Sequence, residues 1–283
     1  MNKIGFDVLA WTAGTSEELL PIMDRLKEIG YDGVEFFIGS PEVPAYKKLG
    51  SHAENIGLEV TAVFVVNKEE NPIDPSAKVR AQALDRIQWA IDRCHDLNAK
   101  ILCGPFHSAF ATFAQHAPTE QEYNWSAEVL HKAGGYAAQE NVVLTIEALN
   151  RFECYLCNTM EQLSHLVVKA DHPNVRAMFD THHANIEEKK LSDALNMIAP
   201  HLAHVHISEN DRGTPGQGHV PWDETFSTLA KINYQGWYTI EGFTRNDPDF
   251  ANAINVWREF AHPWDMAERG FKFIQDMILK HAL

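Results

Sequence analysis

The stretch VVLTIE, residues 142–147, is a short apolar run that ends on a carboxylate, Glu147. Runs of this kind are typical of parallel strands that are buried on both faces of a sheet. Similar runs recur along the whole chain and predict eight strands: Ile4–Leu9, Gly33–Phe37, Leu58–Val66, Lys100–Gly104, Val142–Glu147, Val175–Asp180, Ala203–Ser208 and Trp237–Glu241.

Amphipathic stretches separate these runs and predict helices. Apolar residues at helical spacing lead up to Gly30, a typical helix end, although Pro21 near the start weakens the first turn of this helix. Thr119-x-x-Glu122 is a capping box that opens a helix before the fifth strand. Residues 264–281 predict one further helix at the C-terminus. Eight strand–helix alternations without a Gly/Ser-rich linker favour a single (β/α)8 TIM barrel over residues 1–283, with an additional C-terminal helix.

The bulk composition excludes several classes of protein. The 283 residues include 24 basic and 39 acidic side chains, for a formal charge of −15, and no Lys/Arg run, so no nucleic-acid partner is expected. No stretch approaches the roughly 20 apolar residues of a membrane span, and the N-terminus lacks the features of a signal peptide. The four cysteines do not indicate a disulfide framework, and Cys154-x-x-Cys157 has no second pair at zinc spacing. A reduced, cytoplasmic setting is therefore expected.

Polar residues stand at the ends of four consecutive predicted strands: Glu147, Asp180, His206 and Glu241. Active sites of TIM barrels lie where the carboxyl ends of the strands meet, so these side chains are expected to converge. Three carboxylates in one place repel one another unless they are protonated or bind a cation. One imidazole and three carboxylates suit Mn²⁺, Mg²⁺ or Co²⁺. Each residue alone has another interpretation, a strand-end carboxylate that caps a helix; the set of four indicates a metal site.

The segments after these strands supply further candidate groups. Glu153 and Glu209 are expected to contact substrate hydroxyls or support the ligands, and His183 is favoured over His182 to point inward. His204 is expected one layer deeper than His206 as a hydrogen-bonded barrel residue. Aromatic residues near other strand ends form either a sugar-stacking wall or ordinary core: Trp11, Phe37, Phe64, Phe106 and Phe243. The glycine-containing segment 213–218 has no Lys and is expected to be a flexible loop, which favours a non-phosphorylated sugar.

Several long motifs resemble the D-tagatose 3-epimerase / D-psicose (allulose) 3-epimerase family, within the xylose-isomerase-like TIM barrel superfamily. They are EALNRFE (147–153), FDTHHANIEE (179–188), HVHISE (204–209), PWD (221–223) and IE (240–241), and the opening MNKIG with Trp11 extends the similarity over nearly the whole chain. The resemblance implies a Mn²⁺ or Co²⁺ site made by Glu147, Asp180, His206 and Glu241. It also implies that Glu153, His183 and Arg212 bind substrate oxygens, and that the protein is a homodimer or homotetramer.

Two segments depart from the family pattern. Phe6-Asp7-Val8 lacks the aromatic-rich first strand end of many members, and Gly104–Ser108 differs from the usual apolar loop after the fourth strand. Within the second segment His107 is either a substrate contact or a surface loop residue. Trp11 and His107 are predicted as substrate contacts, and the departures make the identity of the sugar less certain than the metal.

The predicted activity is metal-dependent C3 epimerisation of a free ketose through a cis-enediolate, with Glu147 and Glu241 exchanging the C3 proton. Alternatives with the same metal site are a lyase, a decarboxylase or an aldose–ketose isomerase that acts on a related keto-sugar or 3-keto-glycoside. A DNA repair endonuclease of the same barrel superfamily requires more His ligands and a basic groove, which the composition does not provide. A non-catalytic sugar-binding protein does not need an acid/base pair.

Overall fold

Eight parallel strands form a closed barrel and follow one another around it in chain order. The computed structural model describes residues 2–283. The strands are β1 (Lys3–Asp7), β2 (Gly33–Phe37), β3 (Glu59–Val63), β4 (Ile101–Gly104), β5 (Val143–Ile146), β6 (Val175–Asp180), β7 (Leu202–Ile207) and β8 (Trp237–Ile240). The predicted (β/α)8 fold is therefore confirmed, and all eight predicted strands are present.

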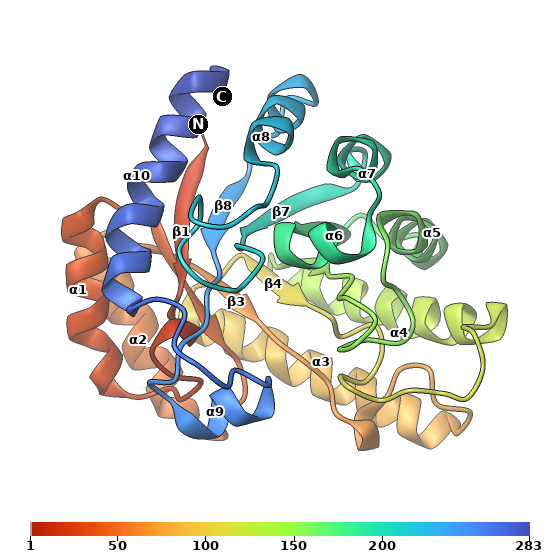
Figure 1. Cartoon of the computed structure of the whole chain (residues 1–283). Helices are drawn as coiled ribbons and strands as arrows, with labels where there is room; N and C mark the ends of the chain where they lie inside the picture. The colour runs from red at the N-terminus through yellow and green to blue at the C-terminus, as the bar shows by residue number, and fades with distance from the viewer. Residues whose placement is uncertain (1) are drawn as a thin grey trace.

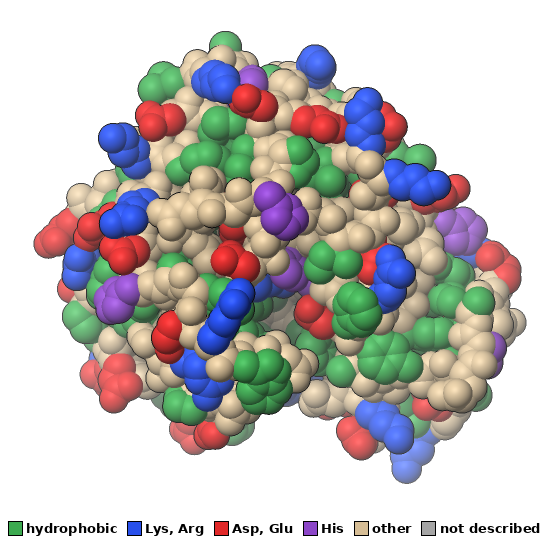
Figure 2. All heavy atoms as spheres, in the orientation of Figure 1, with side chains coloured by type: hydrophobic (Ala, Val, Ile, Leu, Met, Phe, Trp, Pro, Cys, Tyr) green, Lys and Arg blue, Asp and Glu red, His purple; other side chains and the backbone are tan. Residues whose placement is uncertain are grey.

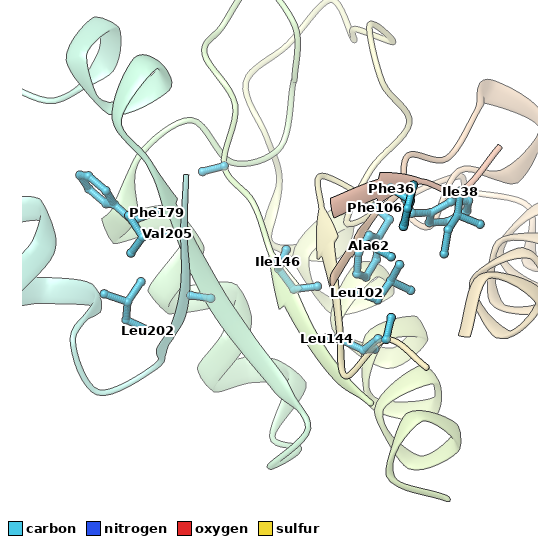
Figure 3. Close-up of a cluster of buried hydrophobic side chains, with 14 of the residues drawn as sticks. Phe36, Ile38, Ala62, Leu102, Phe106, Leu144, Ile146, Phe179, Leu202 and Val205 are labelled. Carbon is cyan, nitrogen blue, oxygen red and sulfur yellow. The ribbon is translucent and has the colours of Figure 1, made fainter. Parts of the chain in front are cut away.

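Side chains alternate between the two faces of each strand, and the two faces differ in chemistry. The outward residues are apolar and fully buried against the helices; Phe36, Ala62, Leu102, Leu144 and Val205 belong to this layer (Figure 3). The inward residues at the neighbouring positions are largely polar and equally buried: Glu35, Thr61, Thr145, His204, His206 and Thr239. The barrel interior is thus a polar, water-excluded environment whose groups have to satisfy one another.

The helices form a layer around the barrel (Figure 1). They are α1 (Leu20–Ile29), α2 (Val43–Ile56), α3 (Ala77–Leu97), α4 (Glu120–Gln139), α5 (Met160–Ala170), α6 (Thr181–Glu187), α7 (Leu191–Ile198), α8 (Trp222–Lys231), α9 (Pro248–Ala253) and α10 (Pro263–His281). The predicted C-terminal helix is α10, which lies between α8 and α1 and completes the ring (Figure 1). Across residues 2–283, none of these helices has both the length and the apolar character that crossing a membrane requires.

The predicted helix ends are confirmed by the backbone. Gly30 ends α1 with φ of 119°, a left-handed conformation that glycine adopts without strain. Pro21 lies in the first turn of α1, where a missing N–H costs nothing, so it does not interrupt the helix. Thr119 and Glu122 form the complete capping box of α4, with the Thr119 N–H donating to the Glu122 carboxylate at 2.7 Å. These local signals fix where α1 ends and where α4 begins.

Some strand boundaries differ from the prediction. β3 ends at Val63, not Val66, because the chain leaves the ladder there while Phe64 and Val66 stay buried in the apolar core. β5 and β8 end at Ile146 and Ile240, so Glu147 and Glu241 each lie one residue beyond their strand. Both carboxylates therefore belong to the rim of the barrel.

Candidate active site at the carboxyl ends of the strands

The four predicted metal ligands converge at the carboxyl ends of β5 to β8. Nδ1 of His206 lies 3.4 Å from a carboxylate oxygen of Glu241 and 3.7 Å from one of Asp180. Glu147, Asp180 and His206 each offer a ligand atom, and these atoms all lie within 4.8 Å of one another. All four residues are buried. The geometry brings together the set that the sequence predicted.

Glu35 holds His206 from below. Its carboxylate lies 2.7 Å from Nε2 of His206 and 3.0 Å from Nε2 of His204, and it accepts a hydrogen bond from the Thr61 hydroxyl at 2.8 Å. His204 occupies the deeper layer, as expected from its position in β7. Because Glu35 engages Nε2 of His206, the opposite nitrogen, Nδ1, faces the carboxylates. Sequence reasoning missed Glu35, although a lone charge within the apolar run Gly33–Phe37 was the available signal.

Burial and crowding shift the acidities of these groups in opposite directions. Burial, together with the nearby carboxylates of Glu241 and Asp180, raises the pKa of Glu147 well above its usual value. Burial also acts to raise the pKa of Asp180, but Arg212 and His183 outweigh it and hold that pKa well below the usual value. Burial opposes protonation of His206, yet Glu35 and Glu241 raise its pKa well above normal. The crowded carboxylates therefore favour protons on Glu147 and His206, and a bound cation would take the place of those protons.

Arg212 supplies part of the compensating charge. Its guanidinium donates to Asp180 at 3.1 Å and to Glu241 at 2.5 Å, and a second nitrogen lies 2.9 Å from Nε2 of His183. The Arg212 backbone has φ of 63°, a left-handed conformation that is costly for a residue with a side chain. The surrounding loop holds this conformation and so fixes the guanidinium over the site.

Glu209 anchors that loop; of the two roles expected from the sequence, contact with substrate hydroxyls or support of neighbouring groups, the contacts favour support. Its buried carboxylate accepts hydrogen bonds from the backbone N–H groups of Gly216 and Val220 and from the indole of Trp222, at 2.8, 3.1 and 3.0 Å. Within the segment 213–218 Glu209 holds the backbone at Gly216, and its bonds to Val220 and Trp222 hold the chain that follows, which argues against the flexible loop expected from the sequence. The physical reason is that one buried carboxylate satisfies several donors that a free loop exposes to water.

A cavity of about 290 Å³ opens over the converged residues. Its polar lining side chains are Glu147, Glu153, His183, Arg212 and Glu241. In the space-filling view, charged and His side chains surround a hollow near the centre of the face, with hydrophobic side chains beside it (Figure 2). Asn150 supports two lining groups, because its side-chain nitrogen lies 2.8 Å from the Glu153 carboxylate and 2.9 Å from Nδ1 of His183.

His183 points into the cavity, as favoured from the sequence, whereas Nδ1 of His182 contacts the backbone oxygen of Glu209 at 3.1 Å. Burial, opposed by Asp180 but reinforced by Arg212, holds the pKa of His183 well below its usual value. The ring is therefore neutral near pH 7 and presents an uncharged polar edge to the cavity.

Two predicted substrate contacts lie outside the cavity lining. Trp11 packs between Phe6 and Trp264, with ring centroids 5.1 and 4.7 Å away, so it stabilises the junction of the first strand with α10. His107 is fully buried, and its Nε2 lies 3.6 Å from the sulfur of Cys154. Of the candidate wall aromatics, Phe37 and Phe243 line the cavity, while Phe64 and Phe106 pack against each other in the core.

The donor set fits a divalent cation. Nδ1 of His206 and one carboxylate oxygen of Glu147 are buried and have no hydrogen-bond partner within residues 2–283. One imidazole nitrogen with several carboxylate oxygens matches the preferences of Mn²⁺, Co²⁺ and Mg²⁺. The four cysteines are buried free thiols, and none belongs to this ligand set.

Fold and site together define a class of protein: a (β/α)8 barrel enzyme whose centre, suited to a cation, lies at the carboxyl ends of its strands. Residues 23–275 match the family described as "Xylose isomerase-like TIM barrel". The chain belongs to this family.

Several of the most similar relatives are named as ketose 3-epimerases. The chain is 28% identical to the D-psicose 3-epimerase of Ruminiclostridium cellulolyticum over 269 residues, which cover 93% of this chain and 91% of the relative. A solved L-ribulose 3-epimerase superimposes with a TM-score of 0.93 at 25% identity, covering 100% of this chain and 96% of the other.

A relative named for a different activity matches at the same identity over a shorter stretch. The chain is 28% identical to the 3-dehydro-D-guloside 4-epimerase of Escherichia coli K12 over 239 residues, covering 82% of this chain and 90% of the relative. The resemblance predicted from the sequence motifs is confirmed, and the chain is an enzyme of the sugar epimerase/isomerase class.

Proposed function

We propose that this protein catalyses the epimerisation of a free ketose at C3, with Mn²⁺ as the preferred ion and Co²⁺ or Mg²⁺ as substitutes. One observation carries the proposal: Glu147 and Glu241 both line the cavity and both belong to the cluster around His206. Inverting a carbon by proton transfer requires one base to take the proton and a second acid to return it on the opposite face. Two rim carboxylates, from β5 and β8, provide this pair.

A bound divalent ion would supply Lewis acidity for the C2 carbonyl and compensate part of the negative charge of the surrounding carboxylates. Glu147, Asp180, His206 and Glu241 are the residues that hold it. The Glu241 carboxylate removes the C3 proton of one epimer, which leaves a cis-enediolate, and protonated Glu147 delivers its own proton to the other face. Glu241 ends the step protonated and Glu147 ends it ionised. The reverse direction exchanges their roles.

Arg212 and His183 orient the substrate in this proposal. Both line the cavity, and a guanidinium nitrogen of Arg212 lies 2.9 Å from Nε2 of His183. Arg212 donates to the oxygens near the reacting carbon, neutral His183 accepts or donates beside it, and Glu153 binds a further hydroxyl. Their buried positions limit the freedom of the C1–C3 segment, which directs the C3–H bond at the base.

A free sugar is favoured over a phosphorylated one. Among the described lining residues, Arg212 is the one Lys or Arg side chain, and its remaining donors already serve the oxygens near C3 in this proposal. A phosphate group requires donors that are free to bind it. Homodimer or homotetramer assembly and a cytoplasmic location stay predictions from the sequence.

The proposal is tested by isotope exchange. The Mn²⁺-loaded protein is incubated in D2O with ketohexoses and ketopentoses, and the products are followed by NMR. We expect one solvent deuterium at C3 of the epimerised product. Glu241→Gln removes the base without a change in size, and we expect turnover to fall at least about 10³-fold.

Glu268→Gln, an exposed glutamate on α10 that pairs with Arg25, is the matched control and should leave turnover unchanged. Wild-type turnover in Glu241→Gln refutes the assignment of the base. Deuterium at C1 identifies aldose–ketose isomerisation. Exchange only with 3-keto-glycosides points to an activity like that of the relative named 3-dehydro-D-guloside 4-epimerase. In either of these two cases C3 epimerisation is refuted while the site itself stands.

A further inference from the structure

The cavity has two halves of opposite chemistry. The polar lining residues all follow β5 to β8: Glu147, Glu153, His183, Arg212 and Glu241. The half formed after β1 to β4 is lined by carbon side chains: Leu9, Phe37, Val63, Val65 and Pro105. The lining side chains from the first four strand ends are all apolar, and the charged ones all follow the last four strands, so one end of a bound substrate faces charged groups and the other end faces hydrocarbon.

The short helix α9 extends the apolar half. Phe250, in α9, and Ile254, which follows it, both line the cavity. Together with Leu9, Val63 and Phe37 they belong to one hydrophobic cluster around the mouth. The apolar surface is therefore continuous from the barrel rim to the covering helix.

Two polar side chains near this half, Thr244 and Asp247, already have partners. The Thr244 hydroxyl donates to the backbone oxygen of Ala10 at 2.7 Å. The Asp247 carboxylate accepts from the Thr12 hydroxyl at 3.0 Å and from the N–H of Ala13 at 3.1 Å. Neither residue is among the side chains that line the cavity. A hydroxyl group placed in the apolar half accordingly finds no side-chain donor or acceptor among the described lining residues.

We propose that the preferred substrate is a ketohexose whose terminal carbon is a methyl group, a 6-deoxy ketose. This inference rests on the proposed function, because C3 epimerisation places C1 to C3 among Glu147, Glu241 and Arg212. The terminal carbon is the one farthest from that polar end and reaches the apolar half. A methyl group gains from burial against Leu9, Phe37 and Val65, whereas a hydroxymethyl group loses hydrogen bonds to water without replacement.

The expected size of the preference follows from what apolar pockets achieve. A hydrocarbon pocket rejects a group that adds one hydroxyl by about 10-fold to 100-fold in kcat/KM. We expect the 6-deoxy sugar to exceed its parent by this factor, mainly through a lower KM. A ketopentose, which lacks the terminal carbon altogether, is expected to fall below the 6-deoxy ketohexose because it leaves the apolar half unfilled.

The experiment uses matched pairs of sugars with the Mn²⁺-loaded full-length protein. Each pair consists of a ketohexose and its 6-deoxy analogue, with fructose and tagatose in both the D and L series, and C3 deuterium exchange is the readout. Val65→Thr adds a hydroxyl to the apolar half without a change in shape, and we expect it to lower the deoxy-to-parent ratio at least about threefold. Val168→Thr, the same change at an exposed position of α5, should leave the ratio unchanged.

The outcomes separate this inference from the proposed function. Exchange at C3 with the parent sugar equal to or faster than its 6-deoxy analogue in every pair overturns the inference and leaves the proposed function standing. A deoxy-to-parent ratio that Val65→Thr does not move also overturns the inference, because the terminal carbon then lies elsewhere. No C3 exchange with any sugar overturns the proposed function, and the inference with it.

Discussion

Nε2 of His206 lies 2.7 Å from the Glu35 carboxylate, a contact that connects β7 to β2 across the whole barrel interior. The contact aims Nδ1 of His206 at the carboxylates of Asp180 and Glu241. Replacing Glu35 with Gln keeps the size but removes the charge that holds the ring. Since partners behind a metal-binding His contribute 10-fold to 100-fold to affinity in other proteins, we expect Glu35→Gln to weaken Mn²⁺ binding by about that factor.

The measurement is Mn²⁺ titration of the chelator-treated protein followed by electron paramagnetic resonance. Glu59→Gln is the control, because Glu59 is exposed at the start of β3 and pairs with Lys3 on the surface. Equal Mn²⁺ affinity in Glu35→Gln and wild type contradicts a supporting role for Glu35.

Arg212 and a metal ion compensate the same negative charges. Arg212 donates to both Asp180 and Glu241, so Arg212→Met leaves two buried carboxylates without their partner. We expect the chelator-treated variant to lose about 3–5 kcal/mol of unfolding free energy, and part of this loss to be recovered with Mn²⁺. Urea unfolding with EDTA and with Mn²⁺ measures both quantities. Arg269→Met, at an exposed position of α10, should change stability by no more than about 0.5 kcal/mol.

A chelator-treated Arg212→Met protein as stable as wild type is the result that counts against this account. It requires the carboxylates to be protonated at neutral pH already.

Glu209 keeps the loop of residues 210–222 in a fixed conformation. In Glu209→Gln one of the two acceptor oxygens becomes an NH2 group, which is itself a donor. It would face the N–H group of either Gly216 or Val220, so at least one of these buried hydrogen bonds is lost. We expect a loss of about 1–3 kcal/mol in stability and faster hydrogen exchange confined to this loop. Hydrogen-exchange mass spectrometry locates the effect. The control is Glu128→Gln, because Glu128 is exposed and pairs with Lys132 on the surface. Unchanged loop protection shows that Glu209 does not anchor the loop.

Cys154 confers a pH dependence on stability. Burial acts to raise the pKa of its thiol, but His107 and Ser108, 3.6 and 3.4 Å from the sulfur, outweigh it and lower the pKa to about 7. An unfolded cysteine has a pKa of about 8.5, so the folded protein binds fewer protons between these values and its stability rises with pH there. The contribution is complete above about pH 8.5, absent below about pH 7 and at most about 2 kcal/mol.

Urea unfolding from pH 6.5 to 9 tests this dependence as a difference between variants. Cys154→Ser should lose the rise, while Cys94→Ser, at another buried cysteine whose pKa burial raises, should keep it. An identical pH profile in Cys154→Ser and wild type rules out the thiolate.

The barrel and its convergent carboxylates were predictable because both are properties of short segments. An apolar run followed by Glu147 or Asp180 is visible without any tertiary information, and chain order alone places consecutive strand ends side by side. Glu35 was not predictable in this way. Its partner His206 lies in β7, across the barrel, and the contact depends on which layer of the interior each inward residue occupies.

Loop paths account for the other differences. Trp11 and His107 each follow a strand end by a few residues, and periodicity does not say where a chain goes after it leaves the sheet. Gly104 has φ of 127°, and a Cβ there would lie 2.2 Å from the Phe64 backbone oxygen, so the chain turns sharply before His107 and carries it into the core. Similarly, Glu209 anchors a loop whose donors come from later residues.

The charged half of the cavity comes from a later part of the sequence than many of the residues in the hydrocarbon half. Six of the apolar lining residues, from Leu9 to Phe110, lie within the first 110 residues; the proposed reacting groups come after them, together with the apolar lining residues Leu149, Phe243, Phe250, Ala253 and Ile254. Under the proposed function, substitutions at Leu9, Phe37 or Val65 are expected to alter which sugar is accepted while Glu147 and Glu241, the proposed acid–base pair, stay in place. A lineage that keeps the second part of the chain fixed is then expected to change its substrate through a few codon changes in the first part.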